Sequence, residues 1–353
     1  TSSPYRAPYH NAIAAIGFEM ESDMFDDDLR PDFETWGSGF PHLTPWFENP
    51  RAQNMYFVGP PAHGRDYRIS SGGFIHGFRY LVRTLHHHLE EKHHQIHWPY
   101  ETLDPKPGNL TMNILTRLDS TSSLFQMFGY LTDVYAITCD NTISFRRYRD
   151  VPIDAIPSMQ LGSDVVAFLV VYLDFHPDWR VPGVDVFAVN RADFTHRRSE
   201  DSNLVHPIFK LFKGDPSGYD EKQMHDGSHL LEFHLIEDFP TIWRDQAVLL
   251  HDFFTEQLNH VLASVSRCAS VFMTQHMQSG YYRQHSENGI RHSMALAKRS
   301  GARWRNQTMV DPEEERIKAE EAVGSREILK RNKLLEGIFG PFSELRDYLA
   351  QLD

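Results

Sequence analysis

The chain has 353 residues, of which 41% are hydrophobic and 24% are charged, and its formal net charge is -13. This composition excludes disorder over most of the chain and predicts about two domains of ordinary size, or one large domain. The acidic balance argues against a protein that coats nucleic acid, because such proteins need a concentrated positive charge. The sequence contains no run of about 18 apolar residues, so it predicts no membrane span.

The first hundred residues predict two short strands and one helix. Residues 12–18 (AIAAIGF) and 54–59 (NMYFVG) are short apolar segments that end at or near a glycine, as buried strands do. From Ser71 onward, apolar residues recur at three- and four-residue spacings, which predicts a helix with Ser70 or Ser71 as its N-cap. Residues 98–108, which contain three prolines and a glycine, then mark a domain boundary.

Beyond the boundary, the pattern predicts a domain of mixed helices and strands. The predicted elements are a helix at 113–135, buried strands at 165–175 (VVAFLVVYLDF) and 184–189, and mostly helical structure at 228–267. From about residue 276 the chain becomes polar. A charge-rich stretch at 313–335 has helical spacing, and we expect it to face solvent or a protein partner.

Residues 54–83 (NMYFVGPPAHGRDYRISSGGFIHGFRYLVR) are the most informative stretch for function. They predict a buried strand, a polar loop, and a helix that starts at Ser71-Gly72-Gly73. Glycines at a helix start let another group approach the backbone, and the unpaired N–H groups there favour negative charge. Such a site suits a phosphate or the N1–C2=O edge of a reduced flavin. The alternative is a crossover whose glycines serve only packing.

Three segments carry a resemblance to a known family. Residues 56–83, residues 86–99 (HHHLEEKHHQIHWP) and residues 124–134 (LFQMFGYLTDV) resemble the FAD-dependent oxidoreductase domain-containing family, which is flavin monooxygenase-like and located in the endoplasmic reticulum lumen. The later segments VPGVDVF and NLVHPIF fit the C-terminal domain of the same family. The resemblance covers roughly residues 10 to 265.

The resemblance implies an α/β fold in three parts. Residues 1–100 would be the C-terminal part of a FAD-binding domain from a FAD/NAD(P)-binding fold with two dinucleotide-binding regions. Residues 101–275 would form a family-specific α+β domain, and residues 276–353 a polar, largely helical extension. The chain lacks the GxGxxG turn that binds the FAD pyrophosphate and the second such turn that binds NADPH. Either these turns belong to a segment that precedes Thr1, or the protein has lost the cofactor.

The resemblance also assigns candidate site residues. Those near the FAD are Gly17, Phe18, Gly59, Ser71, Gly72, Gly73 and Phe74. The N–H groups at the start of the helix would meet the pyrimidine edge of the isoalloxazine. His63, Asp66 and Arg68 are the catalytic candidates, because they lie in the loop where side chains could face the ring or the ribityl chain. Alternatively, Arg68 pairs with Asp66 and only braces the loop.

The implied activity is FAD-dependent oxidoreduction of a small-molecule or protein substrate, with NADPH reducing the flavin. The alternative is a non-catalytic binding or assembly protein that retains part of a flavoprotein fold and binds a protein partner through its C-terminal extension. The absence of the dinucleotide-binding turns supports this alternative.

A histidine-rich helix provides a possible metal site. The six histidines are His86, His87, His88, His93, His94 and His97. They lack HExxH spacing and spread over several helix faces, whereas metal ligands must converge on one point. We therefore predict a solvated polar face and no metal.

Localisation is implied by the resemblance to be the endoplasmic reticulum lumen, with the cytoplasm as the alternative. Two sequons, at Asn109 and Asn306, are compatible with a glycoprotein, but no KDEL-type signal ends the chain. The two cysteines, Cys139 and Cys268, are too few for a disulfide framework and are treated as free.

Overall fold

The structure of the protein, a computed structural model, describes residues 20–33, 39–67, 69–139, 143–175, 204–235, 247–258 and 303–304. Within these residues, seven strands form one sheet in the order β1-β3-β2-β4-β5-β6-β7, and every neighbouring pair is antiparallel. The strands are β1 Tyr100–Leu103, β2 Leu131–Cys139, β3 Ile143–Pro152, β4 Val165–Asp174, β5 His206–Lys213, β6 Leu231–His234 and β7 Arg303–Trp304.

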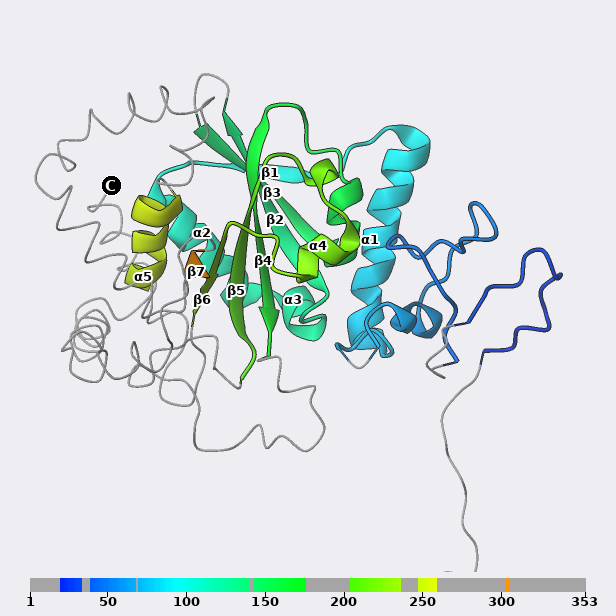
Figure 1. Cartoon of the computed structure of the whole chain (residues 1–353). Helices are drawn as coiled ribbons and strands as arrows, with labels where there is room; N and C mark the ends of the chain where they lie inside the picture. The colour runs from blue at the N-terminus through cyan, green and yellow to red at the C-terminus, as the bar shows by residue number, and fades with distance from the viewer. Residues whose placement is uncertain are drawn as a thin grey trace, which may run out of the picture.

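The helices of the described residues are distributed over the two faces of the sheet (Figure 1). They are η1 Pro60–Gly64, α1 Ile75–His94, α2 Pro107–Ser120, α3 Ser122–Gln126, η2 Ile153–Ser158, η5 Pro216–Gly218, α4 Glu221–His225, α5 Ala247–Asp252 and the π-helix η7 Phe253–Leu258. Apolar residues of α1, α2, α5 and η7 join the core on one face, and residues of η2 and α4 join the core on the other. The result is a mixed fold of helices and an antiparallel sheet.

Strand β4 confirms the prediction of a buried strand at 165–175. Its side chains alternate between the two cores: Leu169 and Val171 belong to one, and Phe168 and Val170 to the other. Because both faces of the sheet are covered here, the sequence is continuously apolar rather than alternating. Phe168 also stacks on its cross-strand partner Phe212, with ring centroids 4.9 Å apart.

Three of the predicted elements are wrong in part. Residues 54–59 form no strand, and Tyr56 makes only an isolated bridge to Glu48. The helix expected over 113–135 ends before Gly129, whose φ of 68° suits glycine, and β2 follows. Within 228–267, residues 231–234 form strand β6, because pairing with β5 overrides the local helical spacing.

Other predictions fall on residues that the structure does not describe. The strands expected at 12–18 and 184–189 lie outside the described residues, and so does the charged helix at 313–335. Of the polar extension, only Arg303 and Trp304 are described. The domain boundaries at 100 and 275 stay predictions.

Helix α1 is present but starts later than predicted. It begins at Ile75 with Phe74 as N-cap, and no side chain caps it, so the prediction of Ser70 or Ser71 as N-cap is wrong. The helix ends at His94, and its C-cap Gln95 adopts the left-handed conformation with a φ of 58°. Among the described residues, no helix is both long and apolar enough to cross a membrane.

Cys139, at the end of β2, is disulfide-bonded and buried. The expectation of free cysteines is therefore wrong for this residue. Sequence spacing gives no signal for such a bond, because a disulfide depends on which segments the fold brings together. The other cysteine of the chain, Cys268, lies outside the described residues.

Candidate functional site

The loop between η1 and α1 is organised around the carboxylate of Asp66. This side chain is fully buried, and its two oxygens accept three hydrogen bonds. One oxygen lies 2.9 Å from Nδ1 of His63, and the other accepts from the Ser70 hydroxyl at 2.5 Å and the Gly72 N–H at 2.8 Å. Because a buried carboxylate is stable only when its oxygens are satisfied, this arrangement fixes the loop before α1.

The glycines of the loop are explained by close packing. A Cβ on Gly72 would lie 2.1 Å from a carboxylate oxygen of Asp66, and one on Gly73 would lie 3.0 Å from the His63 ring. A Cβ on Gly77, in the first turn of α1, would lie 2.0 Å from the Ser71 carbonyl oxygen. Only glycine fits at Gly72 and Gly77, so packing accounts for much of this motif.

Gly59 requires glycine for a different reason. Its φ of 75° and ψ of -146° form a conformation that other residues rarely adopt, while no atom lies within 4 Å of the position of an added Cβ. The position of an added Cβ at Gly59 is therefore open space. The family resemblance implied close passage of the cofactor at this residue. That passage stays a prediction.

The start of α1 is exposed to solvent. Phe74 and Ile75 are 64% and 72% exposed, and the ring of His76 stacks on Phe74 with centroids 5.5 Å apart. Among the described residues, the N–H groups of Gly73, Ile75 and His76 find no acceptor, whereas that of Gly72 is bonded to Asp66. The available donors of this helix start are thus at Gly73, Ile75 and His76.

The structure brings together four of the seven predicted site residues that it describes. His63, Asp66, Gly72 and Gly73 are in mutual contact. Ser71 connects this loop to α3, because its N–H donates to the Gln126 carbonyl at 3.0 Å. Three predicted residues, Gly17, Phe18 and Arg68, lie outside the described residues.

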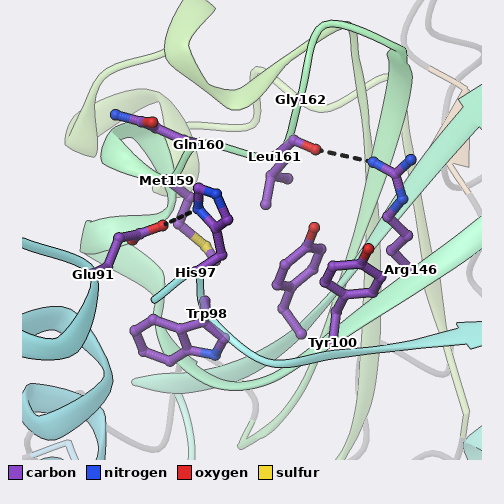
Figure 2. Close-up of a pocket in the computed structure, with 10 residues that line it drawn as sticks. Glu91, His97, Trp98, Tyr100, Arg146, Met159, Gln160, Leu161 and Gly162 are labelled. Atoms are coloured by element: carbon purple, nitrogen blue, oxygen red, sulfur yellow. Dashed lines mark hydrogen bonds and ion pairs between the residues drawn. The ribbon is translucent and has the colours of Figure 1, made fainter. Parts of the chain in front are cut away.

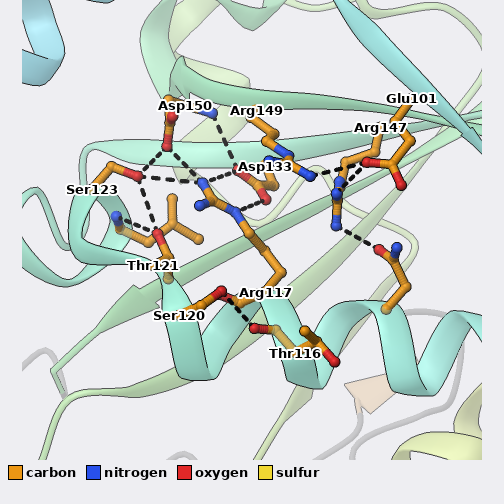
Figure 3. Close-up of polar contacts among 12 residues, drawn as sticks. Glu101, Thr116, Arg117, Ser120, Thr121, Ser123, Asp133, Arg147, Arg149 and Asp150 are labelled. Atoms are coloured by element: carbon orange, nitrogen blue, oxygen red, sulfur yellow. Dashed lines mark hydrogen bonds and ion pairs between the residues drawn. The ribbon is translucent and has the colours of Figure 1, made fainter.

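A second buried polar cluster is centred on Arg117, Asp133 and Asp150 and was not predicted (Figure 3). Arg117 of α2 donates to both oxygens of Asp133, at 2.7 and 3.0 Å, and to Asp150 at 2.7 Å. Asp150 also pairs with Arg83 of α1 and accepts a bond from the Ser123 hydroxyl. The cluster thereby joins three helices to strands β2 and β3. The members lie far apart in the sequence, so no local motif signals them.

A third cluster consists of histidines on β5 and β6. The side chains of His206 and His234 are buried, and Nε2 of His206 lies 2.9 Å from Nδ1 of His234. His206 also contacts the Leu204 carbonyl oxygen through Nδ1 at 2.9 Å, and His234 contacts Glu232 through Nε2 at 2.8 Å. Burial acts to raise the pKa of Glu232, but hydrogen bonds from His229 and His234 outweigh it and hold that pKa well below its ordinary value.

The histidine-rich end of α1 is only partly solvated. His88 stacks on Trp46, with centroids 4.5 Å apart, and His87 packs against Trp98 at 5.2 Å. Burial lowers the pKa of His87 and lowers that of His88 to about 4, where neighbouring Lys92 adds to the effect. The prediction of a solvated face is therefore wrong for these two residues. The described part of the chain contains no group of side chains that could hold a metal ion.

Comparison with known proteins identifies the family of this chain. Over 319 residues it is 31% identical to FAD-dependent oxidoreductase domain-containing protein 2 of Danio rerio, an alignment that covers 84% of this chain and 44% of that protein. Over 246 residues it is 28% identical to the protein of the same name from Mus musculus, covering 67% of this chain and 36% of that protein. The chain belongs to this family.

The match confirms the family that the sequence motifs suggested. The chain spans less than half the length of the curated relatives that it matches. No family model matches the chain, and no solved structure matches it.

Proposed function

We propose that this chain supplies part of the FAD site of an FAD-dependent oxidoreductase. The observation that carries the proposal is the start of α1, where unpaired N–H groups lie beside exposed apolar side chains. The names of the relatives, which identify FAD-dependent oxidoreductase domains, support the choice of cofactor.

The residues at this helix start fit the edge of a flavin. The N–H groups of Gly73, Ile75 and His76, together with the positive end of the helix dipole, favour negative charge such as that at N1–C2=O of a reduced flavin. Phe74 and the stacked His76 ring offer a flat aromatic surface. The N–H of Gly72 already donates to the Asp66 carboxylate, so it is not available to the flavin and instead stabilises the loop before α1.

His63 is the residue best placed to hold a proton near this site. Its Nδ1 lies against the Asp66 carboxylate, which can only accept, so Nδ1 carries the hydrogen. In a neutral ring, Nε2 is then a proton acceptor. We assign Asp66 to positioning, because its oxygens are already engaged within the loop.

Bound FAD would supply the electron and hydride chemistry, which the amino-acid side chains lack. On the basis of the family resemblance, we propose that NADPH reduces the flavin and that the reaction is monooxygenase-like. On the same basis, we propose that the protein is located in the endoplasmic reticulum lumen. The disulfide at Cys139 supports an oxidising compartment, and Asn109 of the first sequon is exposed.

The visible absorption spectrum of the full-length native protein tests the proposal. We expect flavin bands in the folded protein. A colourless protein with a cooperative thermal transition would contradict the proposal and favour the non-catalytic alternative.

A matched pair of variants tests the location of the flavin. Ile75→Asp places a carboxylate beside the unpaired N–H groups, and we expect it to remove most of the flavin by repelling negative charge. Ile96→Asp is the control, since Ile96 is also exposed, at 56%, but follows the other end of α1. Equal flavin content in the two variants, measured by absorbance per folded protein, would refute the placement.

A further inference from the structure

A pocket of about 290 Å³ lies at the opposite end of α1 from the proposed flavin contact (Figure 2). The two sites are separated by the length of a 20-residue helix, about 30 Å. The pocket is formed by five segments: the end of α1, the segment between α1 and β1, strands β1 and β3, and the loop between η2 and β4. Its lining includes Glu91, His97, Trp98, Tyr100, Arg146 and Tyr148.

Three aromatic rings give the pocket its chemical character. Trp98 and Tyr148 are almost entirely buried, at 3% and 4% exposed, while Tyr100 on edge strand β1 is 52% exposed. The rings of Tyr100 and Tyr148 lie 5.4 Å apart, and Trp98 is held from behind by Trp46 and His87. The rings of Trp98 and Tyr148 are therefore fixed by core packing before any ligand arrives, and Tyr100 forms the exposed wall of the pocket.

The charges around the pocket favour a cation. Arg146 lines one side, but its guanidinium is bonded to both oxygens of Asp164, at 2.5 and 3.1 Å. Its positive charge is thus balanced, and it already lies over Tyr100 with Cζ 5.6 Å from the ring centroid. On the opposite side, Glu91 faces His97 at 3.5 Å, which is too long for a strong hydrogen bond. Glu91 therefore leaves negative charge at the pocket, and the carbonyl end of α1 adds to it.

We propose that this pocket binds an organic cation of the methylated or quaternary ammonium class. Aromatic faces attract such cations through the ring quadrupole, and their methyl groups also bury apolar surface against Met159 and Leu161. A flat neutral ring is the rival ligand, since it would use the same aromatic walls. The carboxylate of Glu91 distinguishes the two, because it strengthens binding only of a charged ligand.

Two probes of the same shape test the proposal on the full chain. Choline carries a trimethylammonium group, and 3,3-dimethylbutan-1-ol carries the uncharged tert-butyl group in its place. We expect calorimetry or ligand-observed NMR at matched ionic strength to show saturable binding of choline. The alcohol should bind at least about ten-fold more weakly. Equal affinity for the two probes, or no saturable binding of choline up to about 50 mM, would overturn the proposal.

Substitutions locate the binding within the pocket. Tyr100→Leu should weaken choline binding by about ten-fold. Phe125→Leu should leave it unchanged, because Phe125 is equally exposed, at 52%, but lies on α3 and does not line the pocket. Glu91→Gln should weaken choline binding by about two- to five-fold without changing that of the alcohol. If Tyr100→Leu and Phe125→Leu have the same effect, the cation binds elsewhere and the assignment is wrong.

Discussion

The carboxylate of Asp66 and the carboxylates of Asp133 and Asp150 are all buried, but their partners differ. Asp66 is bonded to an imidazole, a hydroxyl and a backbone N–H, all within six residues of it in the sequence. Asp133 and Asp150 instead share the guanidinium of Arg117, from a helix distant in the sequence. One cluster shapes a loop, whereas the other holds helices against a sheet.

The difference shows that a buried charge can be balanced locally or by distant segments. The local cluster can form as soon as the loop closes. The distant one requires α2, β2 and β3 to be assembled, so its loss should affect the whole fold. Substitutions in the two clusters should therefore differ in size, and they provide ways to test the comparison.

Removal of the shared arginine should have the largest effect. Arg117→Met leaves Asp133 and Asp150 buried with their main cation missing, and we expect the free energy of unfolding to fall by about 3–5 kcal/mol. Chemical denaturation measures this change. Arg149→Met is the control: Arg149 is 52% exposed and pairs with Glu101 at the surface, so it should change stability by less than about 1 kcal/mol. If Arg117→Met lowers the free energy of unfolding by less than about 1 kcal/mol, the Arg117 cluster does not contribute more to stability than the Asp66 cluster.

Removal of the Asp66 carboxylate should have a smaller effect. Asp66→Ala deprives three donors of their acceptor, and we expect a loss of about 2 kcal/mol. The loop should also become more sensitive to limited proteolysis, because its conformation depends on this one side chain. Asp23→Ala, at a side chain 85% exposed, should leave both measurements unchanged. Equal proteolysis of the two variants would show that Asp66 does not fix the loop.

Gly72 tests the packing within the same loop. Gly72→Ala places a Cβ against the Asp66 carboxylate, and we expect a loss of about 1–3 kcal/mol. Gly218→Ala should be close to neutral, because no atom lies within 4 Å of its added Cβ. In an Asp66→Ala background the clash is gone, so Gly72→Ala should there have a much smaller effect. If the losses of stability from Asp66→Ala and Gly72→Ala are additive in the double variant, contact with the Asp66 carboxylate is not the reason that residue 72 is glycine.

The smallest effect is expected for a titration at the histidine-rich end of α1. His88 is held neutral in the folded protein, since burial lowers its pKa to about 4 from an ordinary value near 6.5. As the pH falls, His88 is protonated in the unfolded chain at a higher pH than in the folded protein. Stability is therefore lost as the pH falls from 6.5 towards 4. Because His88 is only partly buried, solvent screens the effect, and we expect the free energy of unfolding to fall by about 1 kcal/mol between pH 7 and pH 5.

A comparison of thermal unfolding at the two pH values measures this loss. His88→Phe preserves stacking on Trp46 and should reduce the loss, whereas His86→Phe, at an exposed position, should not. An unchanged pH dependence in His88→Phe would show that His88 is not its source.

The sequence predicted those features that depend on nearby residues. The buried strand at 165–175 and the helix after Gly73 were visible as hydrophobic patterns, and the family was visible in the motif at 56–83. The sequence also placed His63 and Asp66 in one loop, although it did not show that Asp66 is fully engaged. The contacts of this loop depend on backbone geometry, which residue spacing does not reveal.

Features built from distant segments could not be predicted in this way. The cluster around Arg117 and the pocket beside Trp98 each combine several helices and strands. The sequence of each segment does not indicate which other segments it contacts in the folded protein. The strand at 231–234 is another case, because its pairing with β5 decides its structure. Tertiary contacts, rather than local propensity, determine all three.

The contact between His206 and His234 has a consequence for the pairing of strands β5 and β6. The two strands pair through their backbones over only four residues. The two imidazole rings add a row of three contacts, each of 2.8 or 2.9 Å, that runs from the Leu204 carbonyl oxygen to the Glu232 carboxylate. The short strand β6 is therefore joined to β5 by its side chains as well as by its backbone.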